Sequence, residues 1–150
     1  MESNISSFAW FIEKIIIMSY YFSTILKKTT YEQAIELATA ELQKEGFGVL
    51  TQINVKETLK KKIDVDFRPY IILGACNPHF AHKALLAEDK LGAFLPCNVV
   101  VEQHDDGTVE VSAVDPHAMM ASVTNPKLEE LAGEVREKMQ KVIKGIANHE

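Results

Sequence analysis

Both cysteines of the chain stand directly before an asparagine, in a Gly-Ala-Cys-Asn-Pro motif at 74–78 and a Leu-Pro-Cys-Asn-Val-Val-Val motif at 95–101. An ionised thiol is a nucleophile and a metal ligand, and the start of a helix lowers a thiol pKa. Cys76 comes just before Asn77 and Pro78, which signal a helix start, so it is the candidate catalytic thiol. The alternative is that Cys76 and Cys97 are small buried hydrophobic residues, as free cysteines commonly are.

Two histidines follow the first cysteine at helical spacing. His79 and His82 are three residues apart and would lie on one side of a helix. With Cys76 and Cys97 they would supply two thiolates and two imidazoles, a donor set that suits a zinc or copper ion. Cys-x2-His-x2-His is not a standard zinc motif, so the alternative is a pair of solvated histidines.

A third cluster follows a strand near residue 115. Asp115, His117, Met119 and Met120 are residue types that line pockets, and methionine suits a soft metal or an apolar ligand. The alternative is a loop in which Asp115 makes the turn and the methionines fill the core. Taken together, the clusters give these candidate ligand-binding residues: Cys76, Asn77, Cys97, Asn98, Asp115 and Met119.

The elements that must position these residues are visible as hydrophobic patterns. Strands are predicted over 20–26, 47–55, 70–76, 98–104 and 108–114, with an Asp-Gly hairpin turn at 106–107. Helices are predicted from a capping box at residue 29 or 30 to Gly46, over 55–63 and 78–87, and from Asn125 onward. This β-α-β-(α)-β-α-β-β-α order predicts a single α+β domain whose mixed or antiparallel sheet has one face covered by helices.

Composition excludes several classes of protein. The chain has 150 residues and a net charge of −5, which argues against a nucleic-acid binder. Two cysteines do not make a disulfide framework, so we expect free thiols and a cytoplasmic location. No stretch approaches the roughly 18 apolar residues that cross a membrane, so no membrane partner is expected.

The N-terminal residues 1–17 differ from the rest. They contain the run Phe-Ala-Trp-Phe-Ile-Glu-Lys-Ile-Ile-Ile at 8–17, and Met18 then resembles a natural protein start. Two interpretations stay open: an upstream extension that is an artefact, or an amphipathic helix that packs on the domain or on a partner subunit.

From residue 18 to about 147, the chain resembles the family called domain of unknown function 302. The motifs that carry the resemblance are 74–78 with Ala81 and 84–85, then 95–101, then 115–116 with Met119. The resemblance implies one α+β domain over 18–147, similar to the TATA-box-binding-protein-like fold and usually homodimeric. It implies no established activity, and one fold hosts many functions.

Three hypotheses for function follow. The leading one is a cytoplasmic homodimeric module that binds a small ligand or a metal ion near the two Cys-Asn motifs. The second is a thiol enzyme, redox or nucleophilic, with Cys76 assisted by His79 or Asp115. The third is a structural or partner-binding domain without a small-molecule site.

Overall fold

The computed structural model describes residues 19–150, so the expectations for 1–17 lie outside the described residues. The strands are β1 (Tyr21–Leu26), β2 (Gly48–Asn54), β3 (Tyr70–Cys76), β4 (Cys97–Gln103) and β5 (Val109–Val114). The α-helices are α2 (Tyr31–Lys44), α3 (Val55–Ile63), α4 (Pro78–Ala87), α5 (Pro116–Met119) and α6 (Pro126–Ala147), and η1 (Asp89–Phe94) is a 3-10 helix.

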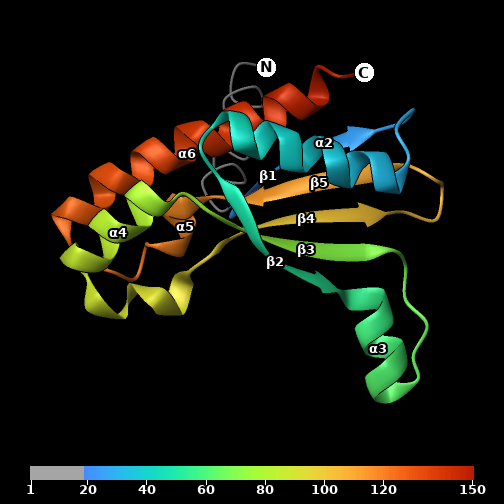
Figure 1. Ribbon diagram of the computed structural model, residues 1–150, viewed down its shortest axis with the longest axis horizontal. Helices are drawn as coiled ribbons and strands as arrows, with labels where there is room; N and C mark the ends of the chain where they lie inside the picture. Colours follow the sequence, from blue (N-terminus) through green and yellow to red (C-terminus); the bar gives the residue numbers. More distant parts are fainter. Residues whose placement is uncertain (1–18) are drawn as a thin grey trace, which may run out of the picture.

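The strands form one sheet in the order β1-β5-β4-β3-β2, and every neighbouring pair is antiparallel. The long helices α2 and α6 lie side by side on one face of this sheet (Figure 1). The α+β fold with helices over one face is therefore confirmed, and the sheet is antiparallel. The more specific resemblance to the TATA-box-binding-protein fold stays a prediction.

The core lies between the sheet and these two helices because the sequence alternates with the period of a strand. On β4 and β5 the buried residues are every second one: Cys97, Val99, Val101, then Val109, Val111 and Ala113. On α6 the helical spacing turns Met139, Val142 and Ile146 to the same core. Fully burying one such aliphatic side chain contributes about 1.5–3 kcal/mol, so this alternation sets which sheet face the helices cover.

The helix starts agree with the sequence in most places. Thr30 and Gln33 form the capping box of α2, so the second of the two predicted boxes is the one that forms. Asn54 accepts a hydrogen bond from the Glu57 backbone at 3.1 Å and caps α3. Asn125 caps α6 and also donates to the Ala87 carbonyl at 2.9 Å, which ties the end of α4 to the start of α6.

Two short helices were not predicted. The 3-10 helix η1 follows α4, and its Leu91 packs with Ala84 and Leu128 in a small second cluster. The one-turn helix α5 replaces the loop expected after Asp115. Both are too short to show a full hydrophobic period, so only packing reveals them. In the part of the chain that the structure describes, no helix is both long and apolar enough to cross a bilayer.

Candidate functional site

An apolar recess opens where β3 ends and β4 begins, beneath α4 and α6. It is lined by Phe47, Ala75, Cys76, Asn77, Phe80, Ala81, Ala84, Leu95, Pro96, Cys97, Pro116, Met120, Leu131, Ala132 and Val135. The cavity volume is about 40 Å³, and the hollow including its open mouth is about 480 Å³. One water needs roughly 10–15 Å³, so the recess admits a small molecule or the end of a longer one.

Strand pairing explains why the two Cys-Asn motifs meet here. β3 runs toward this end of the sheet and β4 leaves from it, with Ala75 opposite Cys97. Cys76 is half-buried, Cys97 is buried, and both thiols are free. The repeated motif therefore marks two neighbouring strand ends that share one recess.

Burial keeps the second thiol protonated. Removal from water, and to a smaller extent the nearby Cys76 thiol, raise the pKa of Cys97 from 9.0 to about 11. At neutral pH Cys97 is thus a neutral, weakly polar group in the recess wall. In the described residues no hydrogen bond joins Cys76 to a histidine or a carboxylate, so the predicted helpers His79 and Asp115 do not activate it in this arrangement.

Asn77 has a different role from the expected helix cap. It occupies the N-cap position of α4, but its side chain makes no capping hydrogen bond there. Instead the buried amide donates to the Glu45 carbonyl at 3.4 Å. That carbonyl precedes Gly46, whose φ of +85° turns the chain from α2 into β2. Asn77 therefore fastens this turn to the start of α4, at the edge of the recess.

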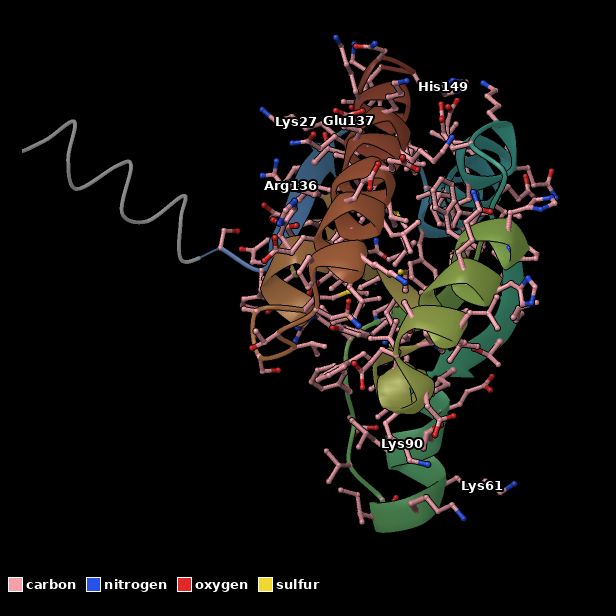
Figure 2. The ribbon with its side chains drawn as sticks, turned by 90° about the vertical axis from the view of Figure 1, so that its left-hand side faces the viewer. Lys27, Lys61, Lys90, Arg136, Glu137 and His149 are labelled. Carbon is pink, nitrogen blue, oxygen red and sulfur yellow. The ribbon has the colours of Figure 1, made fainter. Side chains whose placement is uncertain are left out.

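Both oxygens of the Asp115 carboxylate are bonded to other residues of the protein. Its Oδ1 accepts a hydrogen bond from the His117 backbone at 2.9 Å, and its Oδ2 accepts one from Arg136 Nε at 3.2 Å. The Arg136 guanidinium lies 5.2 Å from the Phe22 ring centroid. Figure 2 shows Arg136 on the side of α6 next to β1. Asp115 thus joins α5, α6 and β1, and Pro116, which follows it, lines the recess.

Asn98 and Met119 lie apart from the recess. Asn98 alternates with the buried Cys97 and Val99, so its side chain points to the face of the sheet that α2 and α6 leave uncovered. With Met119 it lines a different hollow of about 260 Å³. Of the six predicted ligand-binding residues, the structure brings three to the recess: Cys76, Asn77 and Cys97.

The predicted metal donors are not gathered. His79 and His82 are exposed on α4, whereas Cys97 is buried in the recess. Within residues 19–150 there is no group of three or more His, Cys, Asp or Glu side chains placed to hold a metal ion. The two histidines are thus exposed, as in the alternative interpretation of a pair of solvated histidines.

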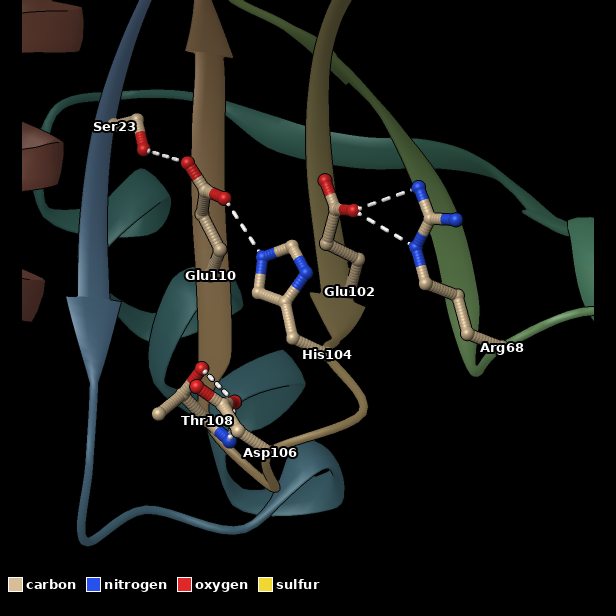
Figure 3. Close-up of polar contacts among 7 residues, drawn as sticks. All are labelled: Ser23, Arg68, Glu102, His104, Asp106, Thr108 and Glu110. Atoms are coloured by element: carbon tan, nitrogen blue, oxygen red, sulfur yellow. Dashed lines mark hydrogen bonds and ion pairs between the residues drawn. The ribbon is translucent and has the colours of Figure 1, made fainter.

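A polar network that the sequence did not reveal lies on the uncovered sheet face (Figure 3). Glu110 accepts a hydrogen bond from Ser23 Oγ and contacts His104 Nε2 at 2.9 Å. Burial raises the pKa of Glu110, but the bonds from Ser23 and His104 outweigh it, and the net pKa is lowered. The glutamate stands between serine and histidine, so the histidine does not contact the hydroxyl as a serine nucleophile requires.

Comparison with known proteins agrees with the motifs. The family model "Domain of unknown function DUF302" matches residues 22–146. A solved structure, the crystal structure of an uncharacterized conserved DUF302 protein from Bacillus stearothermophilus, is 31% identical with a TM-score of 0.77. The alignment covers 84% of this chain and 97% of that chain. No curated protein matches.

Proposed function

Because the chain belongs to the DUF302 family, whose activity is unknown, we propose from its own geometry that it is a binding module for a small apolar ligand. The ligand, or the apolar end of a longer one, would occupy the recess between the ends of β3 and β4 and helices α4 and α6. This location, near the two Cys-Asn motifs, is the one that the sequence predicts. The sequence left the ligand open between a small molecule and a metal ion, and we now propose an apolar small molecule.

The observation that carries the proposal is the composition of the recess wall. Apart from the Asn77 amide and the two thiols, every lining side chain is hydrocarbon or a thioether. The Asn77 amide already donates to Glu45, and the Cys97 thiol stays protonated. Such a wall offers dispersion contacts and almost no hydrogen bonds, which favours apolar ligands over water or ions.

The size of the recess limits both the ligand and its affinity. A volume of about 40 Å³ is well below that of a cavity that holds benzene, roughly 150 Å³. Each methylene removed from water contributes about 0.8 kcal/mol, so three buried methylenes supply about 2.4 kcal/mol. We therefore expect the end of a chain to lie in the recess and the rest of a longer ligand to lie outside its open mouth.

Metal binding and thiol catalysis have less support. Of the four predicted metal donors, the two histidines are exposed and Cys97 is buried. No three of them lie close enough together to hold a metal ion among the described residues. A thiol enzyme needs a base beside its nucleophile, and Asp115 is instead bound to Arg136. The homodimer implied by the family resemblance stays a prediction, which a mass measurement in solution tests.

The experiment is a methyl NMR titration with ethanol, butanol and hexanol. The methyl groups of Ala81, Met120 and Val135 should shift in a saturable way, with affinity rising along the series. Ala81→Leu fills the recess and should abolish the shifts. Ala40→Leu makes the same change at an exposed position of α2 and should leave them intact.

A second variant works in the opposite direction. Phe80→Ala removes a ring from the recess wall and enlarges the recess, so it should strengthen hexanol binding, whether or not Ala81→Leu folds. Equal methyl shifts in Ala81→Leu and Ala40→Leu would contradict the proposal. Shifts confined to methyl groups outside the recess would contradict it as well.

A further inference from the structure

The uncovered sheet face, opposite α2 and α6, carries a groove of about 370 Å³. Val100 of β4 and Ser112 of β5, which are paired in the sheet, form the middle of its floor. Tyr20 and Tyr21 line the groove from the β1 side, and Tyr70 lines it from β3. Ligand-binding clefts commonly measure roughly 300–1,000 Å³, so the groove has the size of a small-molecule site.

The strand period puts a polar group on each side of the floor. Asn98 and Glu102 stand two residues before and two residues after Val100 on β4, so all three side chains are on the same face of the sheet. Asn98 and Glu102 both line the groove. A ligand that lies over Val100 would therefore meet the Asn98 amide at one end and the Glu102 carboxylate at the other.

Glu102 keeps one carboxylate oxygen without a partner. Arg68 Nε and Nη2 both bond to Oε1 of Glu102, each at 3.0 Å (Figure 3). Among residues 19–150 no hydrogen bond is made to Oε2, although only 13% of this side chain is exposed. Every fully buried side-chain oxygen of the described chain has a partner, so Oε2 is open to the groove.

The other polar groups of the groove are also available. Within the described residues, neither the exposed Asn98 amide nor the Ser112 hydroxyl makes a hydrogen bond. Burial and the Glu102 carboxylate raise the pKa of Tyr70, so its hydroxyl stays protonated and able to donate. The groove therefore offers an acceptor at Glu102, a donor at Tyr70, and groups that do both at Asn98 and Ser112.

The charges of the groove favour a neutral ligand. The Glu102 charge is already paired with Arg68. Both oxygens of Glu110 are bonded, one to Ser23 and the other to His104. A cation would have to replace these partners, and an anion would lie against the two carboxylates.

We propose that this groove binds the ring of a neutral sugar. The hydrocarbon face of such a ring would pack on Val100 and beside the tyrosine rings. Its hydroxyls, each a donor and an acceptor, would bond to Glu102 Oε2 at one end and to the Asn98 amide at the other.

The sugar site goes beyond the apolar recess, because the two share no lining residue. Strand alternation places the second Cys-Asn motif between them. Cys97 lines the recess, and Asn98, which the recess does not use, lines the groove on the other face.

The test is a methyl NMR titration of the full chain with the methyl glycosides of glucose, galactose and mannose. At least one of them should shift the methyl groups of Val100 and Val114 in a saturable way. Ala81→Leu, which fills the recess, should leave these shifts unchanged, so the result does not depend on the recess binding a ligand.

Two groove variants have matched controls at exposed positions elsewhere. Asn98→Ala should weaken binding by at least about threefold through the loss of one hydrogen bond, whereas Asn148→Ala should not change the affinity. Ser112→Arg blocks the floor and should abolish the shifts, whereas Ser122→Arg should preserve them.

Three results would overturn the proposal. The first is no saturable shift of the Val100 and Val114 methyl groups with any of the three glycosides. The second is binding that neither Asn98→Ala nor Ser112→Arg weakens. The third is tighter binding of glucosamine or glucuronate than of the neutral glycosides, which would assign the groove to a charged ligand.

Discussion

The two thiols should differ strongly in reactivity although they line the same recess. Cys97 is buried with a pKa of about 11, whereas Cys76 is half-buried at the start of α4. The variants Cys76→Ala and Cys97→Ala each leave one thiol, so that each can be followed alone.

The size of the effect follows from ionisation, because only the thiolate reacts. At pH 8, a thiol with a pKa of about 11 is about 0.1% ionised, and one with the ordinary value of 9.0 is about 9% ionised. Ionisation alone therefore slows Cys97 by about 90-fold relative to an unperturbed thiol, and limited access slows it further.

The assay is the reaction of each variant with Ellman's reagent at pH 8, in native buffer and in concentrated urea. In urea both thiols should react at similar rates. In native buffer the thiol of Cys76→Ala should react at least tens of times more slowly than in urea. If its native and unfolded rates lie within about threefold, the buried, protonated state assigned to Cys97 is wrong.

Three further predictions concern residues beside the recess and the polar network on the uncovered sheet face. Gly46→Ala should lower the free energy of unfolding by about 1–2 kcal/mol in a urea titration, because φ is +85° and the new Cβ would lie 3.0 Å from Asn77 Nδ2. Arg136→Met should destabilise by about 1–3 kcal/mol in the same assay, because it leaves the Asp115 carboxylate without its ion pair. Glu110 has a lowered folded pKa, since bonds from Ser23 and His104 outweigh burial, so its stabilising contribution should be present above its ordinary pKa of 4.5 and lost as pH falls through the folded pKa. Urea titrations at a series of acidic pH values measure that loss.

Matched controls accompany these variants. Gly92→Ala places a Cβ with no atom within 4 Å and should change stability by at most about 0.5 kcal/mol. Lys90→Met removes the exposed Lys90–Asp89 ion pair and should likewise have an effect within about 0.5 kcal/mol. Ser23→Ala should reduce the acid-dependent loss of stability. Equal effects in variants and controls, or an unchanged pH dependence in Ser23→Ala, would contradict these assignments.

The sequence predicts the strands well because their signals are local. The run 70–76 is almost wholly apolar, which predicts β3, and the Asp106-Gly107 turn predicts the hairpin of β4 and β5. The convergence of Cys76 and Cys97 is only suggested by their repeated motif. It depends on strand order and register, which the sequence does not encode locally.

The hydrogen-bond partners of side chains are less predictable from sequence than the helices and strands. Asn77 and Asp115 have the residue types of a binding site, but they bond to Glu45 and Arg136, which are distant in sequence. The Ser23–Glu110–His104 network likewise joins residues from two separate parts of the chain. Helical spacing placed His79 and His82 together, and of the two interpretations that it left open, metal donors or solvated histidines, the structure shows exposed side chains.

Xenon binding tests the central claim most directly, because this atom prefers small apolar cavities and makes no hydrogen bonds. A crystal structure of the full chain under xenon pressure should show one atom in the recess, in contact with Phe47, Cys97 and Val135, and none there in Ala81→Leu. Ordered water in the recess, or xenon bound only elsewhere, would contradict an apolar ligand site between β3, β4, α4 and α6.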